Sequence, residues 1–146
     1  MTAPITLAVD VPADAARVYE VLTTTEGQRG FWTSDCDVTP THARFGFAQA
    51  PMDLEVDVTG EAGKLVRMHV TSGFPYWTGS TWEWELGPAL RAESGTGVLF
   101  RHYGFETGYG AADLGHTART WASILDRLAA YVGSGEAQPF LPGKEG

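Results

Sequence analysis

Hydrophobic and polar residues alternate through several short segments of the chain, a pattern typical of strands with one buried face. The first segment covers residues 5–11, where every second residue is aliphatic. Five more alternating segments lie at residues 43–48, 52–58, 64–70, 80–86 and 97–105. Short turn-like sequences separate neighbouring segments, so we predict an antiparallel meander within residues 35–105.

Helical spacing replaces alternation in two places before the meander. Residues 12–22 carry apolar side chains on one side at Ala15, Val18, Val21 and Leu22. Pro12 suits the first helical position and Asp14 the first turn, where the helix dipole favours an anion. Thr23 and Glu26 have the spacing of a capping box, which predicts a brief second helix that ends near Trp32.

A long helix is predicted at the other end of the chain, over residues 111–135. Gly133 follows the last apolar residue and is the expected C-terminal cap. Residues 134–146 contain two prolines and no period, which predicts an extended tail. The apolar stripe of this helix consists of Leu114, Ala118, Trp121, Leu125, Leu128 and Val132.

The order of elements predicts an α+β fold in one domain that spans residues 1–146. A curved antiparallel sheet of about six to seven strands wraps on the long C-terminal helix, and two short helices follow the first strand. A curved sheet and one helix need not meet along their whole length. We therefore expect a cavity between them, where a small molecule binds.

Charge and composition exclude several kinds of partner. The 146 residues are 43% hydrophobic and 19% charged, which is typical of a globular protein, and the net charge is −8. Nucleic acid and anionic membranes are disfavoured because the sequence has no run of Lys or Arg. The start of the chain does not resemble a leader and no window is apolar enough for a membrane span, so we expect a cytoplasmic protein.

Metal and cofactor chemistry are not expected. Cys36 is the only cysteine, and the adjacent Asp35 and Asp37 should raise the pKa of its thiol, which predicts an inert residue. The histidines at 42, 69, 102 and 116 are not paired at ligand spacing. Three acidic residues, Asp53, Glu55 and Asp57, alternate with apolar ones and should form a solvated face.

One titratable side chain is expected on the inner face of the sheet. Val98, Phe100 and His102 share a face of the last strand. On the preceding strand Trp82 and Trp84 share the apolar face, while Glu83 and Glu85 point outward. Two interpretations of His102 stay open, a hydrogen bond to the protein or one to a ligand. Buried indole N–H groups also need partners.

Further candidate ligand contacts surround this face. Two interpretations of the loop at residues 72–79 stay open: a lip of the entrance, with Phe74, Tyr76 and Trp77 in contact with ligand, or a satellite hydrophobic cluster. Exposed, this aromatic loop is also a candidate surface for a homodimer. The glycine-rich segment 104–115 could form a mobile lid. The full set of predicted ligand-binding residues is Trp32, Phe74, Tyr76, Trp77, Trp82, Trp84, Phe100, His102, Leu114, Thr117 and Trp121.

The chain resembles the START-like (Bet v 1-like, SRPBCC) superfamily, and within it the single-domain bacterial relatives of the C-terminal domain of the Hsp90 ATPase activator. The resemblance rests on residues 11–32, 77–86, 95–105 and 120–135, with a tryptophan after the second helix and His-x-Gly-Phe at the end of the last strand. It implies a helix-grip fold with an internal apolar pocket.

Three functions follow from these observations and the resemblance. The first is binding of a small apolar or aromatic molecule without assured catalysis. The second is a polyketide cyclase or aromatase-like enzyme in which His102 moves protons. The third is an interaction module like the Hsp90 activator domain, which uses an outer surface.

Overall fold

Seven strands and three helices make up the part of the chain that the computed structural model describes, residues 4–48 and 52–140. In chain order they are β1 (Ile5–Val11), α1 (Ala15–Leu22), α2 (Thr25–Phe31), β2 (Asp35–Val38), β3 (His42–Gly46), β4 (Leu54–Glu61), β5 (Leu65–Ser72), β6 (Thr81–Pro88), β7 (Thr96–Tyr103) and α3 (Ala111–Ser134). The α+β class is confirmed, and β2 is the strand that the alternating segments did not mark.

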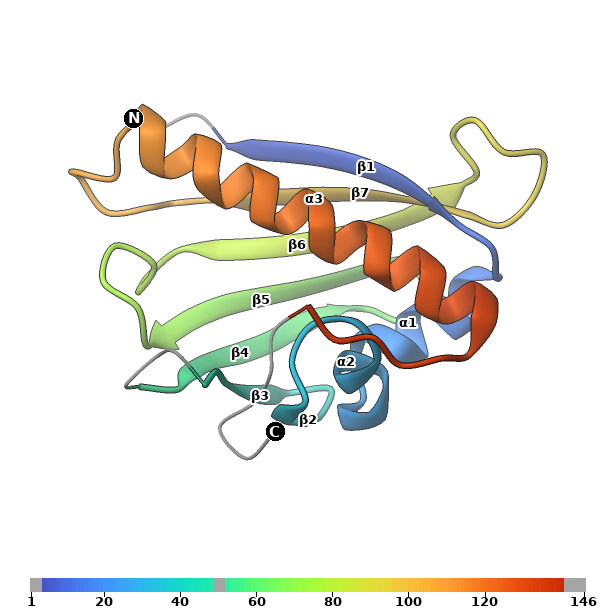
Figure 1. Ribbon diagram of the computed structural model, residues 1–146, viewed down its shortest axis with the longest axis horizontal. Helices are drawn as coiled ribbons and strands as arrows, with labels where there is room; N and C mark the ends of the chain where they lie inside the picture. Colours follow the sequence, from blue (N-terminus) through green and yellow to red (C-terminus); the bar gives the residue numbers. More distant parts are fainter. Residues whose placement is uncertain (1–3, 49–51, 141–146) are drawn as a thin grey trace.

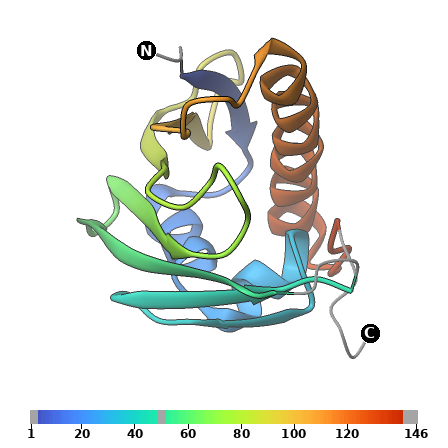
Figure 2. The same ribbon diagram turned by 90° about the vertical axis from the view of Figure 1, so that its left-hand side faces the viewer.

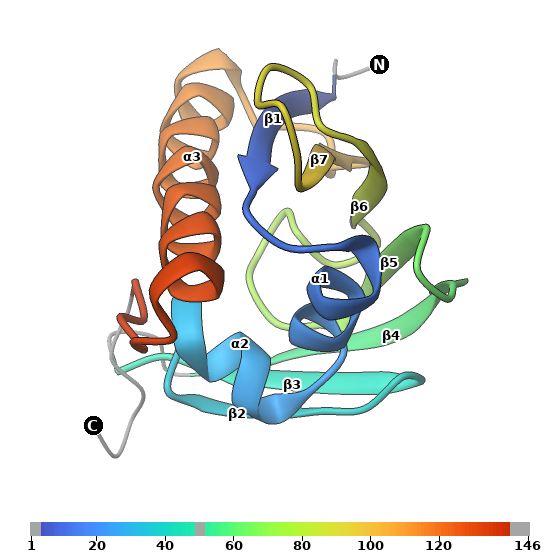
Figure 3. The ribbon, with the colours of Figure 1, turned by 90° about the vertical axis from the view of Figure 1, so that its right-hand side faces the viewer.

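The seven strands form one antiparallel sheet in the order β1-β7-β6-β5-β4-β3-β2. The sheet curls strongly, and α3 lies across its concave side (Figure 1). In the end view, β1 and β2 lie at the two edges of the curled sheet, and α1 and α2 lie at the end that faces the viewer, with α2 next to the C-terminal end of α3 (Figure 3). This is the predicted helix-grip arrangement, with the core between sheet and helices.

The predicted inner face of β6 and β7 is confirmed. Trp82 and Trp84 lie opposite His102 and Phe100 in the β6–β7 register, and all four side chains are fully buried. They pack beneath the indole of Trp121 from α3. The alternation of apolar and polar residues therefore predicted correctly which side chains of these strands point to the core, because successive side chains of a strand point to opposite sides.

The outer face carries charged side chains in pairs. Glu83 lies outward as predicted, yet it is nearly buried, because Arg67 and Arg101 from the flanking strands cover it at 3.3 Å each. Tyr103 donates a hydrogen bond of 2.7 Å to the same carboxylate. Cross-strand pairs of opposite charge stabilise the sheet on this side.

The predicted starts of the two short helices were wrong, by three residues for α1 and by one for α2. Asp14 is the N-cap of α1, since its carboxylate accepts from the Arg17 N–H at 2.9 Å, and Pro12 lies before the helix. Thr24, not Thr23, caps α2 and accepts from Gly27. Thr23 instead ends α1: its backbone N–H and its hydroxyl both donate to the Tyr19 carbonyl.

The end of α3 also differs from the prediction. The helix continues through Gly133, and its C-cap is Gly135, whose φ of 78° lies in the left-handed region that glycine adopts without strain. The chain then crosses α2, where the Gln138 N–H donates to the Gly30 carbonyl at 2.9 Å. The remainder of the predicted tail, residues 141–146, lies outside the described residues.

Candidate functional site

A pocket of about 310 Å³ opens at one end of the molecule. The β5–β6 loop, the β7–α3 loop and the start of α3 lie at this end (Figure 2). Five parts of the chain that are distant in sequence contribute to it: the end of α2, the segment after β3, the two loops, and the first half of α3. Its lining consists of Trp32, Phe47, Phe74, Pro75, Trp77, Tyr109, His116, Thr117, Thr120, Trp121 and Ile124.

The α3 contribution follows from helical spacing. Thr117, Trp121 and Ile124 are separated by four and three residues, so they lie on the same side of the helix, which faces the core. All three are buried. Thr120 and His116 lie beside this stripe toward solvent. The helix therefore presents one wall that is apolar inside and polar at its edge.

The β5–β6 loop turns tightly to bring its aromatic residues inward. The Trp77 N–H donates to the Phe74 carbonyl at 3.1 Å, and Ser80 in turn donates to Trp77. Tyr76 has a positive φ of 69°, which is uncommon outside glycine, so the loop holds a strained turn. As a result Phe74 and Trp77 point into the pocket while the Tyr76 ring is 43% exposed.

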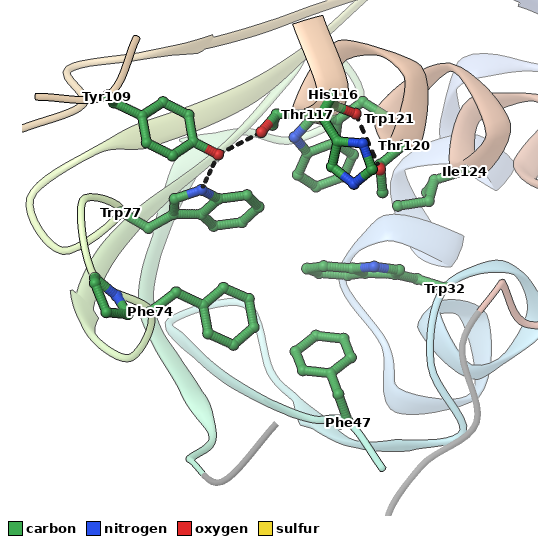
Figure 4. Close-up of a pocket in the computed structure, with 11 residues that line it drawn as sticks. Trp32, Phe47, Phe74, Trp77, Tyr109, His116, Thr117, Thr120, Trp121 and Ile124 are labelled. Atoms are coloured by element: carbon green, nitrogen blue, oxygen red, sulfur yellow. Dashed lines mark hydrogen bonds between the residues drawn. The ribbon is translucent and has the colours of Figure 1, made fainter. Parts of the chain in front are cut away.

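Aromatic rings surround the pocket in a closed series, which we call the aromatic circuit (Figure 4). It consists of Trp32, Phe47, Phe74, Trp77 and Trp121. Successive ring centroids are 5.5, 5.5, 5.3 and 6.3 Å apart, and 5.2 Å separates Trp121 from Trp32. Each ring thus contacts two others at the separations that aromatic pairs favour, which gives the pocket preformed walls.

Polar groups occupy one edge of the circuit. The indole N–H of Trp77 donates to the Tyr109 hydroxyl at 3.2 Å, and that hydroxyl shares a short hydrogen bond with the Thr117 hydroxyl. Nearby, the Thr120 hydroxyl donates to the His116 carbonyl at 3.1 Å. No carboxylate, lysine or arginine is among the described residues that line the pocket.

Five of the eleven predicted ligand-binding residues line this pocket: Trp32, Phe74, Trp77, Thr117 and Trp121. The structure does not bring the other six to it. Trp82, Trp84, Phe100 and His102 are fully buried in the core, deeper along the sheet. Tyr76 points outward from its strained turn, and Leu114 lies one turn before the lining part of α3. Any ligand role of these six remains untested.

Both ring nitrogens of His102 bond to the protein. The Trp121 indole N–H donates to Nδ1 at 3.1 Å, and Nε2 lies 2.9 Å from the Ser80 hydroxyl. Since an indole can only donate, Nδ1 carries no proton, and Nε2–H donates to Ser80. Burial lowers the pKa of His102 to about 3, so the ring is neutral at physiological pH. The geometry is that of a satisfied core histidine.

The predicted partners of buried indoles are only partly present. Trp77 and Trp121 donate to Tyr109 and His102, whereas the N–H groups of Trp82 and Trp84 have no partner among the described residues. Six lining residues were not predicted from the sequence. Two of them carried a usable signal: Phe47 continues the alternation of the buried Ala43 and Phe45 just past the end of β3, and Ile124 lies three residues after Trp121 on the buried side of α3. No periodic pattern predicts the other four, which lie in loops or beside the helical stripe: Pro75, Tyr109, His116 and Thr120.

Cys36 and the acidic residues have structural roles. Cys36 is fully buried, and burial, more than the adjacent Asp37, raises the pKa of its thiol to about 11. Asp53 and Glu55 pair with Arg44 and His42 on the outer side of the sheet. Within residues 4–48 and 52–140, no group of three or more His, Cys, Asp or Glu side chains could hold a metal ion.

The sequence matches no protein-family profile and no curated protein. The fold, in contrast, is similar to many solved structures. A protein from Staphylococcus saprophyticus has a TM-score of 0.76 at 17% identity, over 96% of this chain and 98% of its own. An Aha1 dimer from Colwellia psychrerythraea has a TM-score of 0.75 at 22% identity, over 92% and 98%.

A protein of the dynemicin biosynthetic locus is also similar, with a TM-score of 0.72 at 17% identity over 97% of this chain. The match covers 51% of that protein, so this chain spans about half its length. At these identities the comparisons establish the fold, and a function has to be argued from the site. Among the described helices, none has the length and apolarity that crossing a membrane requires.

Proposed function

We propose that this protein binds a small apolar or aromatic molecule inside the aromatic circuit. The observation that carries the proposal is a preformed pocket of about 310 Å³ whose walls are five aromatic rings. Small-molecule sites are typically concave, of a few hundred Å³, and mostly apolar with a few placed polar groups. Tyr109 and Thr117 supply such polar groups at one edge.

Intrinsic fluorescence tests the proposal directly, because three of the five tryptophans of the chain belong to the circuit. The protein is titrated with two-ring and three-ring aromatic compounds, flavonoids and fatty acids. We expect saturable quenching or a spectral shift with at least one aromatic class. The absence of any saturable change across the panel would refute the proposal.

A pair of substitutions on α3 locates the binding site. Thr120→Phe adds a ring at the pocket wall and should weaken binding at least about tenfold, because the ring fills the space that the ligand needs. Ser123→Phe adds the same ring at an exposed position that does not line the pocket, and it should retain binding. Equal affinities of the two variants would place the ligand elsewhere.

Two alternatives are supported only by resemblance and by fold: a cyclase or aromatase-like enzyme, and an interaction module of the Hsp90 activator kind. Turnover of a polyketide substrate would favour the first, and retention of a chaperone on the immobilised protein the second. Homodimerisation through the aromatic loop is also a proposal, motivated by the exposed ring of Tyr76 and by the fold of the Aha1 dimer. Sedimentation of the free protein tests it.

A further inference from the structure

The polar edge of the pocket has more donor protons than hydrogen bonds. Its three groups are the Trp77 indole N–H, the Tyr109 hydroxyl and the Thr117 hydroxyl, and each carries one proton. Two hydrogen bonds join them, from Trp77 to Tyr109 and between Tyr109 and Thr117. No other side-chain hydrogen bond involves these groups among the described residues, so within that part of the chain one of the three protons has no acceptor.

The unused proton always belongs to a hydroxyl. If Tyr109 donates to Thr117, the Thr117 proton is left over. If Thr117 donates to Tyr109, the Tyr109 oxygen accepts two bonds, and its own proton is left over. The Trp77 proton is engaged in both arrangements. Since both hydroxyls line the pocket, the pair presents one hydrogen-bond donor to whatever occupies it (Figure 4).

A ligand that fills the pocket has to satisfy this donor. Solvent can accept the proton while the pocket is open to water, but an apolar ligand would displace that water and leave a buried O–H unpaired. An unpaired buried donor costs about 1–3 kcal/mol, whereas a ligand oxygen at the same place restores the bond. Thr117 is only 5% exposed, so water has little access to it once the pocket is full.

The acceptor should be neutral. A buried carboxylate needs a paired positive charge to offset its desolvation, and no lysine or arginine is among the described lining residues. His116 lies at the solvent-exposed edge of the pocket, so water surrounds its ring and weakens any interaction with a charged ligand. A ketone, ester or ether oxygen accepts a hydrogen bond without that cost.

We infer that the pocket selects neutral aromatic molecules that carry one hydrogen-bond acceptor, such as an aryl ketone, with the Tyr109–Thr117 hydroxyl pair as the donor. The inference rests on the proposed function. It assigns a specificity-determining role to two side chains that come from the β7–α3 loop and α3.

A matched pair of probes tests it. 2-Acetylnaphthalene and 2-isopropenylnaphthalene have nearly the same shape, and only the first has a carbonyl oxygen. We expect the ketone to bind about 5- to 10-fold more tightly, as one hydrogen bond allows, and also more tightly than 2-naphthoate. Equal dissociation constants for the matched pair, or tighter binding of the naphthoate, would overturn the inference while leaving the proposed function intact. Binding of neither naphthalene would overturn the inference, and the proposed function would then stand or fall with the wider panel of compounds.

The double variant Tyr109→Phe, Thr117→Val assigns the preference to the hydroxyl pair. The readout is the ratio of the two dissociation constants, which general damage to the pocket does not set. This ratio should fall to about one, whereas Tyr76→Phe, which removes a neighbouring hydroxyl outside the pocket, should keep it. An unchanged ratio in the double variant would overturn the assignment. If the double variant does not fold, the carbonyl stretching frequency of bound, isotope-labelled ketone in the unmodified protein decides: a hydrogen-bonded value supports the inference and a free value refutes it.

Discussion

His102 is held neutral in the core by two hydrogen bonds that require an unprotonated Nδ1. Adding a proton would break the bond from Trp121 and would place a charge among aromatic rings. Alternation along β7 correctly predicted that the His102 side chain points inward. It could not predict the hydrogen-bond partners of the ring, because Ser80 and Trp121 come from other parts of the chain.

The lowered pKa of His102 predicts a loss of stability in acid. The unfolded chain binds this proton near pH 6.5, but the folded protein excludes it until about pH 3. Protonation therefore favours unfolding as the pH falls below about 6.5, and the loss should reach about 2 kcal/mol at pH 5. Urea unfolding at pH 7 and pH 5 measures it.

His102→Gln is the control, because an amide can accept from Trp121 and donate to Ser80 without titrating. This variant should start less stable at pH 7 but lose less stability on acidification by about the same 2 kcal/mol. If both proteins lose stability equally between these two pH values, His102 does not have the depressed pKa.

Cys36 should be unreactive in the native protein. Its side chain is fully buried, and its pKa of about 11 leaves little thiolate at pH 8. Reaction with a disulfide reagent such as dithionitrobenzoate should be at least about 100-fold slower than after unfolding in urea. Comparable rates in the two states would show that Cys36 is accessible.

At the scale of the element, α3 covers the concave side of the sheet and lines the pocket. Its C-cap is a glycine in the left-handed conformation. Helical spacing correctly predicted three residues of the buried face of α3, Trp121, Leu125 and Leu128. The other three predicted residues, Leu114, Ala118 and Val132, are only partly buried, and the face is completed by Thr117, Ile124 and Tyr131.

The end of the helix was not predicted either, since Gly133 and Gly135 are both compatible with a cap. The helix ends at Gly135 because the backbone is left-handed there, a conformation that glycine adopts without strain. The pattern of apolar and polar residues contains no information about the φ angle.

The same substitution at two glycines of this element should have opposite effects. Gly135→Ala forces a side chain into a left-handed conformation and should lower the free energy of unfolding by about 1 kcal/mol. Gly115→Ala lies within the helix with no atom near the added methyl group, so it should raise that energy by about 0.5–1 kcal/mol. Thermal or urea unfolding of both variants checks the signs. No loss in Gly135→Ala would contradict the assigned C-cap, and a loss in Gly115→Ala would contradict an open helical position there.

At the scale of the whole molecule, the pocket joins segments that span residues 32–124 in sequence. A ligand would contact α2, the segment after β3, both loops and α3 at once. It could not keep these contacts in the unfolded chain. Binding is therefore coupled to global folding.

Ligand binding should accordingly stabilise the entire protein. At a ligand concentration 100 times the dissociation constant, the free energy of unfolding should rise by about 2.7 kcal/mol, visible as a melting temperature several degrees higher. At the same ligand concentration a tenfold loss of affinity in Thr120→Phe should reduce this increase to about 1.4 kcal/mol or less, and Ser123→Phe should keep it. An equal increase in both variants would indicate a binding site outside the aromatic circuit.

The sequence by itself determined which residues point inward and how the elements are ordered, because periods of two and of about 3.6 residues report the faces of strands and helices directly. These periods predicted the α+β arrangement of a curved sheet on a long helix. Of the five predicted lining residues, Thr117 and Trp121 belong to that helix, whereas Trp32, Phe74 and Trp77 were predicted as aromatic residues at a helix end and in a loop. Only the tertiary structure decided which inward residues pack and which border open space. Alternation says nothing of position along the sheet, so it could not separate Trp82 and Trp84 in the core from Trp32 and Trp77 at the pocket. The loop residues Tyr109 and Tyr76 have no period at all, and their places follow from turn geometry and from the contacts of one loop with another.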